Sequence, residues 1–171
     1  MVGRIQSAKN TNPLLDQPIS RVVCLGHATQ EIYLVDHDDF IVKKDSISVG
    51  EKVYIDQVSY QVGGGGTNAA VTFARHGHQS ILISNLGTDS AAEAIIDFLI
   101  DENVDTSYLN QLDGQTGTSV IMLDSKTASA TTMTCLGFAA KYKNLTASDL
   151  SLANPDWLYV TGLSGDMEKL L

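Results

Sequence analysis

Four consecutive glycines, Gly63, Gly64, Gly65 and Gly66, constrain this chain more than any other stretch of its sequence. A strand-like alternating segment precedes them, and an apolar helix pattern over residues 71–76, ended by Gly77, follows them. Glycine has no Cβ, so the run can take positive φ and bring the backbone close to a ligand. Because a helix N-terminus has unpaired N–H groups, the turn could hold a phosphate, or a polyhydroxyl ligand bound by backbone amides and Asn68.

The composition is that of a globular domain with an acidic surface. The 171 residues include 43% hydrophobic and 18% charged side chains and carry a net charge of −9. Nucleic acid and anionic membranes need a basic surface, so we expect neither as the main partner. The sequence shows no signal peptide and no apolar run of membrane-spanning length, and Cys24 and Cys135 are expected to be buried thiols. These features predict a cytoplasmic protein.

The order of apolar segments predicts an α/β fold. Residues 1–20 suggest a flexible leader, and residues 21–25 predict a buried strand that ends at Gly26. Residues 80–84 predict a second core strand. Between the two core strands, residues 31–62 predict a small antiparallel sheet, inserted where a simple doubly wound domain would have only a short connection.

Further elements are predicted along the chain. The phase of alternation changes between residues 53–55 and 58–62, which indicates a bulge within one long strand from Lys52 to Val62. Asp89 or Ser90 is expected to cap a helix that runs to about Glu102. Other expected elements are short strands at 32–35 and 40–42, a hairpin of 118–123 with 130–135, a short capped helix from Thr146, a buried strand at 157–162 and the start of a helix at 166–171.

Two other stretches of the sequence match different kinds of site. The acidic turn Asp36-His37-Asp38-Asp39 could bind a metal, although such clusters are more often solvated hairpin tips. The spacing Gly64-x-Gly66-x-x-Ala69 matches a dinucleotide-binding fingerprint, and Asp89 lies 20 residues beyond Ala69. An NAD(P)-binding Rossmann-type module is therefore an alternative. Against it, the strand before the glycines belongs to the predicted antiparallel sheet, and a cap explains Asp89.

The glycine stretch also resembles a known family signature. Gly63-Gly64-x-x-x-Asn68-x-Ala70, followed by a helix and Gly77, is similar to the N-terminal signature of the ribokinase-like (PfkB) carbohydrate and nucleoside kinases. The resemblance extends over about residues 21–165 and implies a ribokinase-like three-layer α/β/α core, here incomplete, with a small β-sheet lid from residues 31–62 and 118–135. Its other landmarks are Gly26 with Glu31, Gly50-Glu51, Leu86-Gly87-x-Asp89, Asn103-Val104-Asp105-Thr106, Thr116-Gly117-Thr118 and Gly137-x-Ala139.

The resemblance implies a substrate site in this chain. Gly63 and Gly64 would let the backbone pack against a sugar, and Asn68 would hydrogen-bond a sugar hydroxyl. Glu31 would accept hydrogen bonds from two hydroxyls, since an ionised carboxylate only accepts, and Thr29 would add a contact. From the residues alone, Asn68 is equally plausible as a helix N-cap and Glu31 as an exposed strand residue. Glu31 replaces the family's more usual Asp.

Family members are longer, and their second half supplies a Gly-Ala-Gly-Asp turn with the catalytic Asp and the ATP pocket. That turn is absent from this sequence, which ends within an apparent helix. We therefore expect a truncated, sugar- or nucleoside-binding portion of an ATP- and Mg²⁺-dependent kinase. It would have no catalytic residue, bind no cofactor or metal alone, and be inactive alone. A homodimer through the lid is a further expectation, and a non-catalytic dimerisation module is another alternative.

Overall fold

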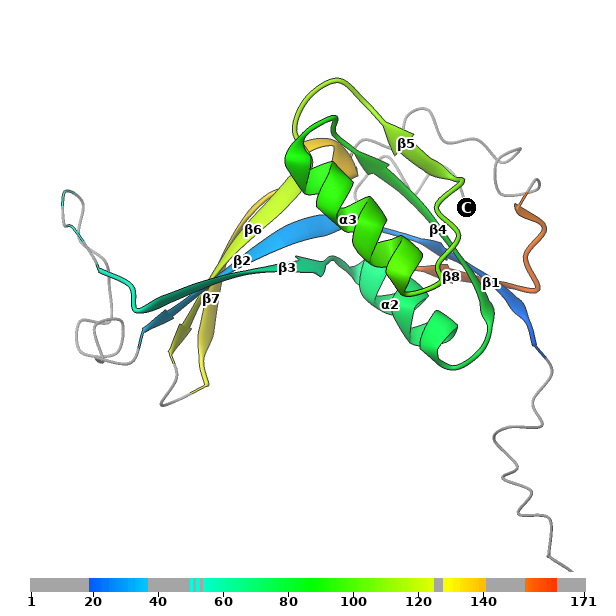
Figure 1. The fold of residues 1–171 in the computed structure, drawn as a ribbon, viewed down its shortest axis with the longest axis horizontal. Helices are drawn as coiled ribbons and strands as arrows, with labels where there is room; N and C mark the ends of the chain where they lie inside the picture. Colours follow the sequence, from blue (N-terminus) through cyan, green and yellow to red (C-terminus); the bar gives the residue numbers. More distant parts are fainter. Residues whose placement is uncertain are drawn as a thin grey trace, which may run out of the picture.

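The computed structural model describes residues 19–36, 50, 52, 54–124, 128–140 and 153–162. Two four-stranded sheets and two α-helices make up the described part (Figure 1). The elements are β1 (Arg21–Leu25), β2 (Thr29–Asp36), β3 (Gln57–Gly63), α2 (Gly65–Arg75), β4 (Gln79–Leu86), α3 (Ser90–Asp101), β5 (Leu109–Gln111), β6 (Gly117–Asp124), β7 (Ala130–Cys135), the 3₁₀ helix η1 (Gly137–Ala140) and β8 (Trp157–Val160).

The first sheet, called here the core sheet, has the strand order β5-β4-β1-β8, and all of its pairs are parallel. Helices α2 and α3 pack on one face, where Leu82 and Leu86 of β4 belong to one buried cluster with Ala70 of α2 and Ile95 and Leu99 of α3. Val23, Leu25, Ile81 and Ile83 form a second buried cluster on the other face. Strands buried on both faces read as continuous apolar runs, which is why residues 21–25 and 80–84 were recognisable as core strands.

The two helices begin in different ways. Asp89 is the N-cap of α3, as predicted, and its Oδ1 accepts a hydrogen bond from the Ala92 amide at 3.1 Å. The N-cap of α2 is Gly64, with φ of 92°, so the interpretation of Asn68 as a cap is wrong. Asn68 lies inside the helix, one turn after its start, because the glycines themselves begin the helix.

The second sheet, called here the lid sheet, has the order β3-β2-β6-β7 and extends away from the core as an arm (Figure 1). β2 pairs antiparallel with β3 and parallel with β6, and β6 pairs antiparallel with β7. The predicted hairpin of 118–123 with 130–135 is therefore confirmed, whereas the sheet that contains β2 and β3 is mixed rather than purely antiparallel. The β2–β3 ladder runs from Thr29 opposite Gly63 to Val35 opposite Gln57. Because β3 begins only at Gln57, the long strand from Lys52 and its internal bulge are not formed at the described positions.

Two predictions of burial are wrong. β8 is a strand beside β1, but Trp157 is 69% and Tyr159 45% exposed, because β8 is the edge strand of the described core sheet. Cys135 is exposed, unlike the buried Cys24, because every residue of β7, the edge strand of the lid sheet, is exposed. An apolar segment predicts a strand, whereas burial depends on what packs against it.

Several predictions fall on residues outside the described part: the leader up to residue 18, the strand at 40–42, the tip of the acidic turn at 37–39, the helix from Thr146 and the helix at 166–171. Neither α2 nor α3, the α-helices of the described residues, is long and apolar enough to cross a membrane.

Candidate functional site

The lid sheet meets the core at the point where β2 begins and β3 ends. Thr29 is buried there and lies opposite Gly63 in the β2–β3 ladder. The carboxyl group of Glu31 lies directly over Gly63, and a Cβ at that position would collide with it. A glycine is thus required at position 63 for Glu31 to occupy its place. The half-buried Glu31 carboxylate consequently lies against bare backbone at the lid–core junction.

Tyr33 holds the Glu31 carboxylate in place. Two residues apart on one strand, the two side chains share a face of β2, and the Tyr33 hydroxyl donates a 2.9 Å hydrogen bond to Glu31 Oε2. This hydrogen bond, together with partial desolvation and the negative charge of Glu31, raises the pKa of Tyr33. Tyr33 was not among the predicted site residues, although the two-residue period of the predicted strand was the signal for it.

The glycine turn is closed by an internal carbonyl group. The His27 carbonyl oxygen accepts hydrogen bonds from the amides of Gly66 at 3.0 Å and Thr67 at 3.4 Å. Gly64 has φ of 92°, and a Cβ there would strike the same carbonyl. Two amides of the first turn of α2 are therefore already bonded within the protein. This arrangement argues against a phosphate cradle at this turn, since such a cradle needs those N–H groups to face the ligand.

Asn68 lies on a neighbouring surface. It is exposed and lines a groove of about 380 Å³ with Gly65 and Thr161, between α2 and the end of β8. Gly65 packs closely on Thr161, since an added Cβ would come within 2.8 Å of Thr161 Oγ1. Glu31 does not line this groove. The structure thus brings Thr29, Glu31, Gly63 and Gly64 together and places Asn68 one helical turn further along.

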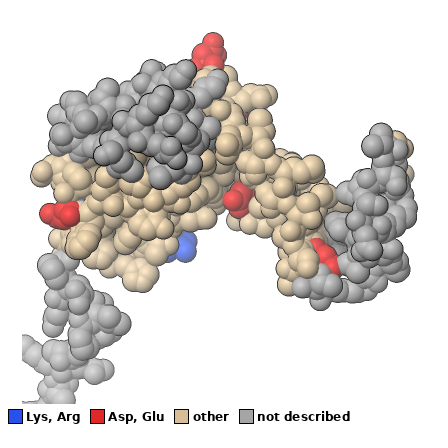
Figure 2. Space-filling view, turned by 180° about the vertical axis from the view of Figure 1, so that it is seen from behind, with Lys and Arg blue, Asp and Glu red and all other residues tan. Residues whose placement is uncertain are grey.

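His27 occupies the carboxyl edge of the core sheet beside these residues. Burial lowers the pKa of its imidazole, and its ring packs over Gly162, which follows β8. β1 has β4 on one side and β8 on the other, so the order in which the chain adds strands to the sheet reverses at β1. In open α/β sheets, ligands bind at such a switch point, outside the carboxyl ends of the strands. Seen from behind, the surface is hollowed in the angle between the core and the lid arm, and an acidic side chain lies in that angle (Figure 2).

The dinucleotide-binding alternative does not fit this geometry. The strand before the glycines is β3 of the lid sheet, not a parallel core strand. The Asp89 carboxylate accepts hydrogen bonds from the Ala92 amide and from the amide and hydroxyl of Thr116. Burial by itself would raise the pKa of Asp89, but these hydrogen bonds outweigh it and lower the pKa. The Asp89 carboxylate is therefore already hydrogen-bonded within the protein, whereas the corresponding acid of a Rossmann fold binds the ribose of the dinucleotide.

Within the described residues, no group of three or more His, Cys, Asp and Glu side chains is placed to hold a metal ion. The acidic turn named above lies mainly outside that part of the chain. What the site offers is one half-buried carboxylate, bare glycine backbone and an exposed amide side chain. These groups suit a neutral ligand that carries several hydroxyls, because hydroxyls can donate to the carboxylate and also accept from the amide.

Comparisons with known proteins agree with this description. A family model described as "pfkB family carbohydrate kinase" matches residues 20–171. The fructosamine kinase FrlD of Bacillus subtilis is 36% identical over 83 residues, which are 47% of this chain and 29% of that protein.

Two ribokinase structures resemble the fold. Ribokinase from Thermotoga maritima has a TM-score of 0.67 at 22% identity over 82% of this chain and 44% of its own length. Arabidopsis thaliana ribokinase, solved with ribose and ATP, has a TM-score of 0.64 at 19% identity over 85% of this chain and 55% of its own. At these identities the likeness concerns the fold alone. The matched part spans less than a third of the fructosamine kinase and about half of each ribokinase.

Proposed function

Since the chain belongs to the pfkB family of carbohydrate kinases, we propose that it is the sugar-binding portion of an ATP-dependent kinase that phosphorylates a hydroxymethyl group of a sugar or nucleoside. The observation that carries this proposal is the Glu31 carboxylate, held by Tyr33 over the bare backbone of Gly63. A carboxylate accepts about four hydrogen bonds, of which Tyr33 uses one. The remaining capacity suits neighbouring hydroxyls of a polyol.

The position of Glu31 on the lid sheet gives the proposal its mechanism. Glu31 and Thr29 are on β2, whereas Asn68 is on α2 of the core. A sugar bound to both would connect the lid sheet with helix α2 of the core. Closing the lid over it would exclude water, which protects a phosphoryl donor from hydrolysis. The names of the relatives, a fructosamine kinase and a ribokinase with ribose and ATP, support a sugar as the ligand class and ATP as the donor.

We propose that the catalytic base and the ATP site of this kinase lie outside this chain. No Gly-Ala-Gly-Asp turn occurs in its sequence, so the residues proposed here bind and orient the sugar and none is a catalytic base. Phosphoryl transfer depends on positioning ATP with Mg²⁺, and we propose that the intact protein does this with residues outside this chain. ATP-dependent phosphorylation of a sugar by the purified 171-residue chain would contradict this part of the proposal.

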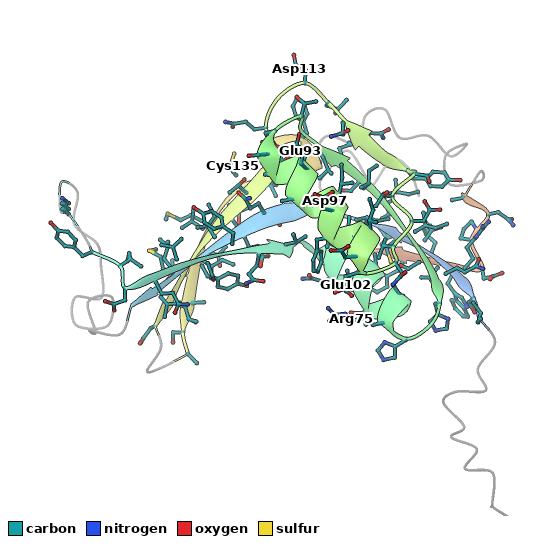
Figure 3. The ribbon with its side chains drawn as sticks, in the orientation of Figure 1. Arg75, Glu93, Asp97, Glu102, Asp113 and Cys135 are labelled. Atoms are coloured by element: carbon teal, nitrogen blue, oxygen red, sulfur yellow. The ribbon has the colours of Figure 1, made fainter. Side chains whose placement is uncertain are left out.

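A thermal-shift panel of ribose, fructose, fructosamine, nucleosides and NAD(P) tests the ligand class, because only a ligand of the folded state raises the melting temperature. We expect a sugar or a nucleoside to raise it. Glu31→Gln should abolish the shift, because an amide cannot accept on both sides, whereas Glu93→Gln should keep it. Glu93 is an exposed residue in the first turn of α3, a helix that carries none of the proposed ligand residues (Figure 3). Stabilisation by NAD(P) and by none of the sugars or nucleosides would reject the proposal.

Pairing of two chains through the lid sheet is a second candidate role. The lid sheet exposes the large apolar side chains of Val58, Tyr60 and Met133, at 49%, 67% and 56%. Burying such groups between two copies would be favourable. Sedimentation analysis of the chain and of a Tyr60→Ser, Met133→Ser variant tests this role: a dimer that the double variant loses supports it, and a monomer over the whole concentration range rejects it.

A further inference from the structure

The lid sheet is also fastened to the core at β6, by a cluster unlike the glycine turn. Three backbone segments meet there: 87–89 between β4 and α3, 114–116 before β6, and 136–138 after β7. The Thr88 amide donates to the Gly114 carbonyl at 3.1 Å, and the Phe138 amide donates to the Gln115 carbonyl at 3.2 Å. Gly87 permits this approach, since a Cβ there would strike the Gly114 carbonyl and the Thr116 amide.

Asp89 and Thr116 are at the centre of this cluster. Asp89 Oδ2 accepts the Thr116 amide at 2.9 Å, and Asp89 Oδ1 accepts the Thr116 hydroxyl. The Thr116 hydroxyl in turn accepts the Gly87 amide at 2.9 Å, and it is buried. Hydrogen bonds to an ionised carboxylate are about twice as strong as neutral ones. The cap of α3 needs only one oxygen of Asp89, so its bonds to Thr116 serve something besides the helix.

A short path of direct contacts connects this cluster with the candidate site. Thr116 immediately precedes Gly117, the first residue of β6, and Gly117 lies opposite Thr29 on β2. Glu31 follows two residues along the same strand. A shift of Thr116 would therefore move the start of the β6–β2 ladder and carry Glu31 with it. The attachment of the lid at Gly63 and Gly64 is bare backbone and would not resist this shift through side chains.

We propose that Asp89 is a positioning residue: through its hydrogen bonds to Thr116 it holds the core-proximal end of β6, and through the β6–β2 pairing it sets the place of Glu31 over Gly63. The role of Glu31 as a sugar ligand rests on the proposed function, but the fastening of the lid does not. Asp89 contacts no ligand in this proposal, and its effect on binding is exerted through Thr116 and β2.

Hydrogen exchange on the 171-residue chain, followed by mass spectrometry or NMR, tests the fastening directly. Thr116→Val keeps the shape of the side chain but removes the hydroxyl, whereas Thr116→Ser keeps the hydroxyl as a matched control. We expect Thr116→Val to speed exchange of the β6 and β2 amides nearest the core by about tenfold or more, the size expected for losing a charge-assisted bond. Core amides in β1 and β4 should keep their rates, and Thr116→Ser should exchange like the parent chain.

Asp89→Ser supplies an independent variant, because serine still caps α3 but is too short to reach Thr116. Asp89→Ser should speed exchange of the same β6 and β2 amides as Thr116→Val. If Thr116→Val does not fold, the exchange rates of Asp89→Ser test the proposal instead. Equal acceleration of core and lid amides would overturn the proposal, since Asp89 would then contribute only to global stability. Unchanged lid rates would overturn it as well.

Sugar affinity separates this inference from the proposed function. If the parent chain binds a sugar, Thr116→Val should weaken sugar binding by about tenfold, whereas Thr116→Ser should bind like the parent chain. The loss of affinity should be in proportion to the rise in the exchange rates of the lid amides. A faster-exchanging lid with undiminished affinity would show that the cluster does not position Glu31 and would overturn that part of the proposal. If the parent chain binds no sugar or nucleoside, the proposed function fails, and the exchange rates still decide whether Asp89 fastens the lid.

Discussion

Within the described residues, the two sheets have the same number of strands but differ in how deeply their strands are buried. In β1 of the core sheet, Val23, Cys24 and Leu25 are completely buried, whereas all six residues of β7 in the lid sheet are exposed. Buried apolar area is the main source of folding free energy, so the core sheet carries the stability of the chain. The lid sheet is held by its own backbone pairing and by its attachments to the core. We therefore expect the lid sheet to change position at a lower free-energy cost than the core sheet.

Truncating a core side chain should have the largest effect on stability. Leu25→Ala removes a fully buried side chain from β1 and should cost about 2–5 kcal/mol of unfolding free energy. Met133→Ala, at a half-exposed position of β7, should cost well under about 1 kcal/mol. Denaturant unfolding of both variants measures the difference. Similar losses would show that the lid contributes as much as the core and would remove the contrast between the sheets.

The glycine turn joins the two sheets and should rank next. Gly64→Ala places a side chain at φ of 92° and drives it into the His27 carbonyl, so we expect a loss of about 1–3 kcal/mol. Gly77→Ala is the matched control, because Gly77 has φ of 85° but open space around it. It should show only the conformational penalty, about 1 kcal/mol. Equal losses in the two variants would mean that the contact with His27 has no energetic role.

The contrast between the sheets also explains which parts of the fold follow from the sequence. The core strands, the α3 cap and the lid hairpin were predictable, because local periodicity and cap chemistry determine them. The exposure of β8 and of Cys135 was not predictable, because exposure depends on which elements cover a strand. The family resemblance rested on the order of the glycine landmarks. That resemblance in turn predicted that residues 31–62 and 118–135 form one lid.

The candidate site was predictable only in part for a similar reason. Glu31 and Gly63 could be named in advance, but their direct contact is made across two strands and no local pattern encodes it. The same holds for Thr116, which meets Asp89 over 27 positions of sequence. Asn68 was a plausible cap on local chemistry, yet the His27 carbonyl, brought back by the chain between β1 and β2, bonds to the first amides of the helix instead.

Acid should weaken the core edge beside the turn. Burial lowers the pKa of His27, so folding favours its neutral form. The stability that depends on neutral His27 is fully present above its unfolded pKa of about 6.5 and is lost as the pH falls through the lower folded value. Melting temperatures between neutral and mildly acidic pH should fall less steeply for His27→Gln than for the parent chain. Parallel curves would show that another group causes the acid sensitivity.

An ion pair on the core surface should have the smallest effect. Arg75, in the last turn of α2, donates from Nε and Nη2 to both carboxylate oxygens of Glu102 at the end of α3, and the two side chains lie side by side in Figure 3. Although the pair connects two core helices, Arg75 is largely exposed, and exposed pairs contribute little because solvent and salt screen them. We expect Glu102→Gln to leave the melting temperature unchanged at physiological salt. A clear loss would mean that the core helices depend on this surface contact as well as on the buried face they share with β4, and the stability of the core sheet could then no longer be assigned to burial alone.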